Sequence, residues 1–330
     1  MVSLKTIAER CGVSTATVSK ALNDHKDISE ETKNRVKQTA QTLGYFPNAA
    51  ARALKTNRSY NIGVLFEEEA GRGLTHEYFS GVLNGLKIQA EKLRYDITFI
   101  NTCFENRKMS YYEHCRYRNF EGVVIVCANF DDPDVIELMN SEIPVVTIDY
   151  VHHNCTAVTS NNIQGMEDLV KYIYSQGHRK IAYIHGQEGS SVTRDRLASF
   201  YRTIDELGLE IPDTYVRSAD YLETKGSAKQ TKELLNLEDP PTCIIYPDDT
   251  SLIGGRNVII EMGLRIPRDI SVAGYDGTMI SQLLYPKLTT IRQNTEMIGS
   301  EAATRLIGTI EKPRTTLVER VVIEGSLVPG

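Results

Sequence analysis

Residues 4–23, LKTIAERCGVSTATVSKALN, have the spacing of a helix-turn-helix. Ala8 is small where two helices must approach closely, and Gly12 can adopt the positive φ that turns the chain between them. Ser14 is a good N-cap for the second helix, because its hydroxyl can accept a hydrogen bond from a free backbone amide. The apolar residues that we expect to pack between the helices are Ile7, Ala8, Val13, Val18 and Leu22.

The second helix of this motif would carry short side chains and one cation on its outer face: Thr15, Ala16, Thr17, Ser19, Lys20 and Asn23. These groups are suited to base edges in a major groove and to the adjacent phosphates. The same spacing also occurs in an ordinary surface corner of two helices, so the motif alone leaves two interpretations open. A third helix is expected to begin after Ser29, because two glutamates in its first turn suit the helix dipole.

The motif LKTIAERCGVSTATVSKALN and the alanine-rich residues 49–54 resemble the DNA-binding head of the LacI/GalR repressor family. Two later motifs match the family where its chain crosses between two lobes: NNIQGMEDLVKYIYSQGHRKIAYIHG and LTTIRQNTEMIGSEAATRLI. The likeness covers essentially all of the 330 residues. It implies a sequence-specific transcriptional regulator, most often a repressor, whose homodimer binds a pseudo-palindromic operator in double-stranded DNA.

The resemblance and the outer face of the second helix together give the residues that we predict to contact DNA. Thr15, Ala16 and Lys20 would lie nearest the bases. Lys20 stands where many family members have arginine, so its contact with a guanine would be a single cation rather than a bidentate fork. The full predicted set is Leu4, Lys5, Ser14, Thr15, Ala16, Thr17, Ser19, Lys20, Asn23, Ser29, Thr32, Tyr45, Asn48, Ala51 and Leu54.

Residues 49–54 predict a helix, capped by Asn48, that is too short to be stable alone. Small side chains such as Ala51 let its backbone lie close to another surface. A plain linker helix is one interpretation. In the family, paired hinge helices from two subunits enter the minor groove and a leucine wedges the central base step, and the matching residue is Leu54.

The net charge of −6 at first argues against nucleic acid, but the charges are unevenly distributed. Residues 1–60 hold ten Lys and Arg and five Asp and Glu, a net charge of +5, whereas the remainder holds 27 basic and 38 acidic residues, a net charge of −11. A basic head on an acidic body concentrates the attraction for phosphates at one end of the chain.

The composition also indicates a compartment. No apolar run reaches the ~18–20 residues that span a bilayer, and the N-terminus lacks the apolar segment of a signal peptide. Six scattered cysteines without a CxxC pair are typical of reduced thiols. We therefore expect a cytoplasmic, nucleoid-associated protein. No leucine heptads follow VERVVIEGSLV, so we expect a dimer rather than a tetramer.

From residue 61 onward, apolar runs alternate with amphipathic stretches, which predicts right-handed βαβ units with parallel sheets. The expected strands are Ile62–Phe66, Ile97–Asn101, Val123–Val126, Val145–Ile148, Ile181–Ile184, Thr242–Tyr246 and Ser271–Gly274. The expected helices are Tyr78–Leu93, Asp134–Asn140, Met166–Gln176, Arg194–Leu207 and Ser251–Met262. This run is too long for one sheet, and the resemblance implies two lobes of a periplasmic-binding-protein type with a cleft between them.

The predicted fold class is therefore a small all-α helix-turn-helix head followed by an α/β two-lobed body with parallel sheets. We expect the head at residues 1–47, the hinge helix and linker at 48–60, and an effector-binding and dimerisation body at 61–330. The N-lobe would comprise about 61–159 and 290–322, and the C-lobe about 160–289 with the C-terminal tail.

Open α/β sheets bind ligands beyond the carboxyl ends of their strands, and several polar residues fall there. Asp149 ends PVVTID, Asp248 follows CIIYP and Asp276 follows SVAGY. In the family the matching positions grip an effector, usually a sugar. Carboxylates accept hydrogen bonds from vicinal hydroxyls, and an arginine donates a fixed fork. The predicted effector-binding residues are Phe79, Asp149, Arg196, Asp248, Tyr275 and Asp276.

Each of these residues has a structural alternative. An aspartate at a strand end often only caps a turn. Arg196 could instead pair at the surface with Asp195 or Glu206, and Phe79 could pack in the core. Asp248 stands where many family members carry Asn or Ser, which leaves the effector open. The chain has no Trp, so a sugar face would stack on Tyr or Phe, the nearest being Tyr150, Tyr246 and Tyr275.

Other kinds of site have weak signals. His152, His153 and Cys155 form one short cluster without a second ligand pair, which favours a solvated loop over a metal site. The sequence has no GxGxxG after a strand, no HExxH, no GxSxG and no Walker loop. We therefore expect no cofactor, no metal and no enzymatic activity.

Two other classes of protein compete with the regulator. A sugar-binding protein would share the two-lobed body, but a basic head without a signal peptide argues against uptake. A sugar-processing enzyme could use the paired carboxylates Asp248 and Asp249, but no activated nucleophile accompanies them. Within the regulator hypothesis, the effector could be a sugar or a sugar phosphate, and an inducer or a corepressor partner could control DNA binding.

Overall fold

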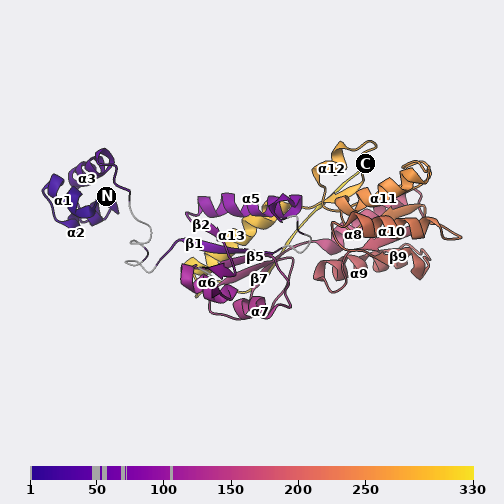
Figure 1. Cartoon of the computed structure of the whole chain (residues 1–330), viewed down its shortest axis with the longest axis horizontal. Helices are drawn as coiled ribbons and strands as arrows, with labels where there is room; N and C mark the ends of the chain where they lie inside the picture. The colour runs from indigo at the N-terminus through magenta and orange to yellow at the C-terminus, as the bar shows by residue number, and fades with distance from the viewer. Residues whose placement is uncertain (1, 47–52, 54–57, 68–70, 72, 105–106) are drawn as a thin grey trace. The chain divides into compact units, whose positions relative to one another are not determined.

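The structure, a computed structural model of the chain, describes residues 2–46, 53, 58–67, 71, 73–104 and 107–330 (Figure 1). The chain divides into two compact units, residues 1–59 and 60–330. Nearly all of the predicted hinge helix, and with it the predicted DNA contacts of Asn48, Ala51 and Leu54, lies outside the described residues.

Within residues 2–46 the first unit contains three helices: α1 (Leu4–Cys11), α2 (Thr15–Leu22) and α3 (Glu30–Thr42). Each begins after a serine whose side chain accepts a hydrogen bond from the backbone N–H three residues later: Ser3, Ser14 and Ser29. Gly12 ends α1 with a φ of 62°, as its sequence position predicted. The buried core consists of Ile7, Ala8, Cys11, Val18, Ala21, Val36 and Ala40. The helix-turn-helix is confirmed, although Val13 and Leu22 lie partly exposed at the margin of this core.

A parallel six-stranded sheet forms the centre of the first lobe of the body, the N-lobe. Its strands, in spatial order, are β13 (Arg320–Ile323), β7 (Thr156–Ser160), β6 (Val145–Ile148), β5 (Val123–Cys127), β1 (Asn61–Phe66) and β2 (Asp96–Phe99). Figure 1 shows α5 (Glu77–Lys92) and α13 (Thr295–Glu311) on one face of the sheet, and α6 (Tyr111–Arg118) and α7 (Pro133–Met139) on the other. Alternate strand residues supply the two cores, since successive side chains point to opposite faces.

Glycines let α5 and α13 pack backbone against backbone. A Cβ atom added at Gly299 of α13 would lie 1.9 Å from the carbonyl oxygen of Val82 in α5. A Cβ atom at Gly85 of α5 would lie 2.1 Å from the carbonyl oxygen of Glu296 in α13. Neither position has room for any side chain, so these glycines set the distance between the two helices.

A parallel four-stranded sheet forms the centre of the second lobe, the C-lobe. Its strands, in spatial order, are β11 (Ser271–Ala273), β10 (Cys243–Ile245), β8 (Ile181–His185) and β9 (Val216–Ser218). The helices α8 (Asn162–Ser175) and α9 (Ser191–Glu206) share a core with one face of this sheet. Residues of α10 (Thr224–Leu235) and α11 (Asp249–Glu261) pack into the core on the other face.

Smaller elements complete the body. The C-lobe also contains α12 (Met279–Leu283) and an antiparallel pair, β12 (Thr290–Arg292) with β14 (Ser326–Val328). The N-lobe contains a short hairpin, β3 (Cys103–Phe104) with β4 (Arg107–Lys108), and a 3-10 turn at Gly73–Thr75, while a second such turn, Asp213–Tyr215, precedes β9. None of the described helices is both long enough and apolar enough to cross a lipid bilayer.

The chain passes between the lobes three times, after β7, after β12 and after β13. These connections are joined to one another by hydrogen bonds. The side chain of Asn161 donates to Glu324 Oε1 over 2.8 Å, and its backbone N–H donates to the carbonyl of Ile323 over 2.8 Å. The hydroxyl of Ser160 donates to Gln293 Oε1.

The predicted fold class, a helical head with an α/β body of parallel sheets, is confirmed. All seven expected strands and all five expected helices are present. The helix α8 begins four residues earlier than expected, because the side chain of Asn161 caps it, and α9 begins three residues earlier, directly after Ser190.

Candidate functional site

Polar residues from both lobes meet at the carboxyl ends of the sheets. Asp149 directly follows β6 of the N-lobe, and Asp276 lies three residues beyond β11 of the C-lobe. Both aspartates have left-handed backbones, with φ values of 52° and 98°. Such a conformation is uncommon for residues with a Cβ and is a reason to look for function.

Asp149 is linked to both lobes. Its carboxylate accepts hydrogen bonds from the hydroxyl of Tyr78 in α5 and from the backbone N–H of Ser160, the latter over 2.8 Å. Its backbone carbonyl accepts a hydrogen bond of 2.7 Å from the hydroxyl of Ser191 in the C-lobe. Burial raises the pKa of Asp149, and the hydrogen bond from Tyr78 opposes that shift.

Asp276 is connected to the N-lobe through Gln293. The Gln293 Nε2 atom donates to Asp276 Oδ1 over 2.6 Å, and Gln293 Oε1 accepts from Ser160 at the end of β7. Burial raises the pKa of Asp276 to about 7, with Arg196 opposing this and the neighbouring carboxylates of Asp248 and Asp249 adding to it.

Arg196 is a buried cation in the middle of the site. Its side chain is 3% exposed, and it donates from Nε to Asn162 Oδ1 over 2.8 Å and from Nη1 to the carbonyl of Pro247 over 3.0 Å. The guanidinium lies over the ring of Tyr275, 3.5 Å from its centroid. Among the described residues, no carboxylate forms an ion pair with Arg196, so its charge is met by carbonyl dipoles and a ring face.

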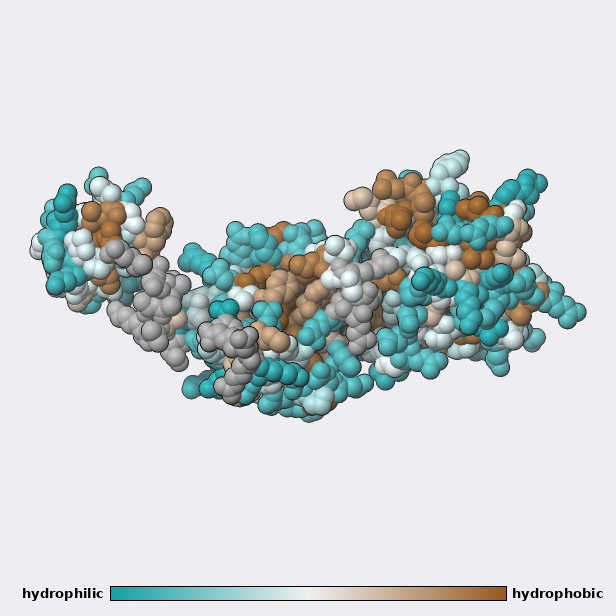
Figure 2. Space-filling model, in the orientation of Figure 1, coloured by the Kyte–Doolittle hydropathy of each residue, from teal (hydrophilic) through white to brown (hydrophobic). Residues whose placement is uncertain are grey.

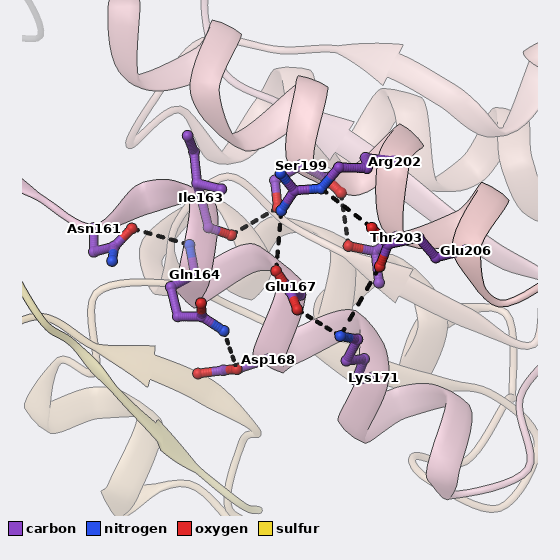
Figure 3. A network of polar contacts seen from close by, with 10 residues as sticks. All are labelled: Asn161, Ile163, Gln164, Glu167, Asp168, Lys171, Ser199, Arg202, Thr203 and Glu206. Atoms are coloured by element: carbon purple, nitrogen blue, oxygen red, sulfur yellow. Dashed lines mark hydrogen bonds and ion pairs between the residues drawn. The ribbon is translucent and has the colours of Figure 1, made fainter.

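The surface partners that Arg196 could have used are engaged elsewhere. Glu206 lies 3.6 Å from Arg202 Nε and 4.0 Å from Lys171 Nζ, in the network that joins α8 and α9 (Figure 3). Asp195 lies 3.5 Å from Arg320 Nη2. The interpretation of Arg196 as a surface ion-pair partner is therefore wrong.

The network in Figure 3 explains why Arg196 points inward. Arg202 donates to Glu167 Oε2 over 3.0 Å, and the hydroxyl of Ser199 donates to the carbonyl of Ile163 over 2.6 Å. These contacts fix the rotation of α9 against α8. Arg196, which precedes Arg202 by six residues or about one and two-thirds turns, then lies in the interior of the C-lobe.

Asp248 and Asp249 are used by the fold itself. Asp248 caps α11, and its carboxylate accepts hydrogen bonds from the backbone N–H and the hydroxyl of Ser251 and from the backbone N–H of Leu222. The carboxylate of Asp249 accepts from Thr278 and Thr290, and burial raises its pKa to about 6. For Asp248 the geometry favours the capping alternative over contact with an effector.

Raising the pH from 5 to 8 is expected to lower the free energy of unfolding of the body by about 2–4 kcal/mol. The pKa values of about 7 for Asp276 and about 6 for Asp249 lie above the ordinary value of 3.8. The folded state therefore holds these protons more tightly than the unfolded state, and the stability that they contribute is lost as the pH rises through 6 and 7. Urea unfolding at the two pH values measures this change.

The variant Asp276→Asn should remove most of this pH dependence, because an amide does not ionise. The exposed carboxylate of Asp213 provides a control, and Asp213→Asn should retain the dependence of the parent protein. Equal slopes for the Asp276 variant and the parent would contradict the assignment.

The aromatic residues divide between the site and the cores. Tyr275 lies under Arg196, whereas Phe79 packs against Phe66, His76 and Tyr78 at the edge of the N-lobe core. Tyr150 stacks on Phe130, with ring centroids 3.8 Å apart. Tyr246 was wrongly placed near a sugar: it is fully buried in the C-lobe core, where its hydroxyl bonds to Thr231.

Three polar groups of the site did not appear in the sequence prediction: Tyr78, Tyr221 and Gln293. The hydroxyl of Tyr221 lies 2.9 Å from Thr193 Oγ1, in the turn of α9 that precedes Arg196. The nearest signal in the sequence was that of Tyr78, which directly precedes the predicted site residue Phe79. A recess of about 670 Å³ lies at the ends of β1 and β2, and none of the six predicted effector residues lines it.

The head presents most of its predicted DNA contacts to solvent. Lys5, Ser14, Thr15, Ala16, Lys20, Asn23 and Ser29 are exposed, and Leu4, Thr17, Ser19, Thr32 and Tyr45 are half-buried. Ser14 and Thr17 bond to each other over 2.9 Å, as do Ser29 and Thr32, so these hydroxyls help to cap their helices. Lys20 forms an ion pair with Asp27 on the same surface.

Two family models match the chain. Residues 3–48 match bacterial regulatory proteins of the lacI family, and residues 170–330 match a periplasmic binding protein-like domain. The chain is 29% identical over 318 residues to the probable HTH-type transcriptional repressor ExuR of Bacillus subtilis (strain 168), covering 96% of this chain and 93% of that protein. It is 28% identical over 315 residues to the HTH-type transcriptional repressor PurR of Aliivibrio salmonicida (strain LFI1238), covering 94% and 93%.

The whole fold also matches a solved structure of the Lac repressor dimer bound to operator and the anti-inducer ONPF. The TM-score is 0.81 at 26% identity, and the match covers 99% of this chain and 97% of that one. The chain belongs to the LacI family. The resemblance seen in the sequence is thus confirmed, and the LacI-family relatives named above are repressors rather than enzymes.

The site of this LacI-family protein contains no cluster suited to a metal ion. Within the described ranges, no group of three or more His, Cys, Asp and Glu side chains is arranged to hold a metal. His152 and Cys155 lie 3.8 Å apart, but the thiol of Cys155 is buried and contacts the carbonyl of Met139. The arrangement offers carboxylates, one guanidinium and phenolic hydroxyls, which are groups that can form hydrogen bonds with a polar ligand.

Proposed function

We propose that this LacI-family protein is a transcriptional repressor that binds a pseudo-palindromic operator as a homodimer, under the control of a sugar or sugar phosphate. The exposed face of α2 is the observation that carries the proposal. It offers Thr15, Ala16 and Lys20 to a major groove, on a head whose basic residues outnumber its acidic ones. ExuR and PurR are repressors by name, and the Lac repressor is a dimer on its operator. Such a protein acts in the cytoplasm at the nucleoid.

The effector would bind among Asp149, Arg196, Tyr275 and Asp276, with Phe79 at the edge. Asp149 and Asp276 are bonded to Tyr78 and Gln293, both of which connect to the N-lobe. Hydroxyls of a sugar can replace these two donors, and the guanidinium of Arg196 can hold an oxygen of the ring or of a phosphate.

Binding there would change the relation between the lobes. Direct contacts already join them: Ser191 with the carbonyl of Asp149 over 2.7 Å, and the N–H of Met279 with Glu77 Oε1 over 2.7 Å. An effector that binds one arrangement of the lobes more tightly than another shifts the population between them. In this proposal that shift alters the grip of the paired heads and hinge segments on DNA.

An apolar patch on the C-lobe supports the homodimer. Met279, Leu283 and Tyr285 are 66%, 75% and 92% exposed, and they lie on and beside α12. Figure 2 shows this apolar surface over α12. Ile260, Met262 and Ile280 extend the exposed apolar surface. A second copy related by a twofold axis could cover the same patch on both subunits.

Changing Lys20→Ala is expected to weaken operator binding by about tenfold or more, because one charge-assisted contact is lost. The fold of the head should survive, since Lys20 is an exposed residue whose ion pair with Asp27 contributes little stability. Operator sequences selected from random duplex DNA with the parent protein, followed by binding titrations with the variant, provide the measurement. We expect Leu54→Ala to weaken binding similarly.

Lys37→Ala is the matched control. Lys37 lies on α3, forms a similar ion pair with Asp24 and is not a predicted DNA contact. Its affinity for the selected operator should stay within about threefold of the parent value. Unchanged affinity in both the Lys20 and the Leu54 variants, or binding without preference for any symmetric sequence, would refute the proposal.

A further inference from the structure

The loop between β9 and α10, residues 219–223, carries Tyr221 into the site described above. The ring of Tyr221 covers Gly186, just beyond β8, so closely that a Cβ atom there would lie 2.1 Å from Tyr221 Cζ. Its hydroxyl bonds to Thr193 over 2.9 Å. Tyr221 is thus held by Gly186 against its ring and by Thr193 at its hydroxyl. Burial raises the pKa of that hydroxyl.

The next residue has an unfavourable backbone. Leu222 has a φ of 59°, in the left-handed region where a branched apolar side chain is rarely found. A leucine gains nothing from this conformation by itself, so neighbouring groups must hold it. One such group is the carboxylate of Asp248, which accepts the backbone N–H of Leu222 over 2.8 Å.

The carboxylate of Asp248 has little capacity to accept further hydrogen bonds. Its side chain is 1% exposed, and three donors converge on it: the N–H of Leu222, the N–H of Ser251 and the hydroxyl of Ser251. A carboxylate has about four acceptor positions. Three of them are occupied by donors from two residues, Leu222 and Ser251, of which Leu222 lies 26 residues before Asp248.

We infer that Asp248 is a positioning residue, which holds Leu222 in its left-handed conformation and thereby fixes the ring of Tyr221 in the effector site. It ties the start of α11 to the loop before α10 and does not grip the effector itself. The inference rests on the proposed function for the identity of the site, but the geometry that it concerns exists without any ligand.

The test follows Tyr221 directly in the full-length protein. Tetranitromethane nitrates exposed phenolates, and peptide mass spectrometry gives the rate at each tyrosine. We expect Asp248→Asn to raise the nitration rate of Tyr221 at least about fivefold, because an amide nitrogen facing the Leu222 N–H removes the restraint and the loop opens locally. The rates of the buried core residues Tyr215 and Tyr246 should not change.

Two further variants separate positioning from general destabilisation. Ser251→Ala removes one donor to Asp248 but leaves the bond to Leu222, so Tyr221 should react within about twofold of its parent rate. Adding Leu222→Asn to Asp248→Asn should restore most of the protection, since asparagine adopts the left-handed conformation more readily than leucine. The double variant is the decisive rescue, because position 248 remains asparagine and the carboxylate is not restored.

If the Asp248→Asn variant does not fold, Leu222→Val provides the test in its place. A β-branched residue is a poor occupant of the left-handed region, so this variant should expose Tyr221 while Asp248 still caps α11. An unchanged nitration rate of Tyr221 in either variant, failure of the rescue, or an equal rise at Tyr215 and Tyr246 would overturn the inference. None of these readouts uses an effector, so a failed effector screen would count against the proposed function and leave this test intact.

Discussion

Replacing Gly299 with alanine is expected to destabilise the body by about 3 kcal/mol or more, although only one methyl group is added. The new Cβ atom would lie 1.9 Å from the carbonyl oxygen of Val82 and 2.6 Å from the backbone nitrogen of Leu86. These are atoms of the α5 backbone, which cannot rotate away as a side chain can. The two helices must separate, and the N-lobe core beneath them loses its packing.

Gly308 provides a control on the same helix. A Cβ atom at Gly308 would meet nothing within 4 Å, so Gly308→Ala should stabilise the protein by about 0.5–1 kcal/mol through helix propensity. Chemical unfolding of the two variants beside the parent gives both values. Similar effects for the two substitutions would show that α5 and α13 do not pack as closely as described.

Replacing Arg196 with methionine is expected to weaken effector binding by about 100-fold, because a charge-assisted fork is worth several kcal/mol in a buried site. The effector is first identified with a thermal-shift screen of sugars and sugar phosphates on the parent protein, since a bound ligand raises the melting temperature by mass action. The variant should give no shift with that compound at the same concentration. The variant should still bind the operator of the parent protein, but the compound should no longer change its affinity for that operator.

Arg202→Met is the matched control for this experiment. Arg202 lies on the same helix, but its guanidinium is exposed and paired with Glu167 in the network of Figure 3. Its loss should leave the effector response intact, because a surface ion pair contributes little, and the Ser199–Ile163 hydrogen bond and the buried Phe200 still hold the rotation of α9. An Arg196→Met protein that still responds with the parent affinity would remove Arg196 from the site.

The sequence predicted the scaffold well because the relevant signals are local. Ser14, Gly12 and the apolar spacing of residues 4–23 determine the helix-turn-helix within one short segment, and the capping bonds are those expected. The buried parallel strands, such as Val145–Ile148, are continuous β-branched or apolar runs that stand out between polar loops. Asp149 and Asp276 became candidates because they follow such strands, and Arg196 because it lies in the second turn of the helix that follows β8.

The remaining site residues depend on contacts between distant segments. Gln293 lies in a connection between lobes, and its partners Ser160 and Asp276 are 133 and 17 residues away along the chain. Tyr221 follows a strand of three residues, too short to give a pattern. Likewise, nothing in the local sequence distinguishes Gly299, which has no room for a methyl group, from Gly308, which has ample room.

The edge strand β13 determines the order in which the parts of the protein can complete their folding during synthesis. The head is complete once α3 has left the ribosome, and the central sheet of the C-lobe is complete at residue 273. The N-lobe sheet begins at residue 61, but its sixth strand, β13, is complete only when residue 323 has emerged. The DNA-binding head of a nascent chain can therefore fold during most of translation. The N-lobe, which follows the head along the chain, is the last part to be completed.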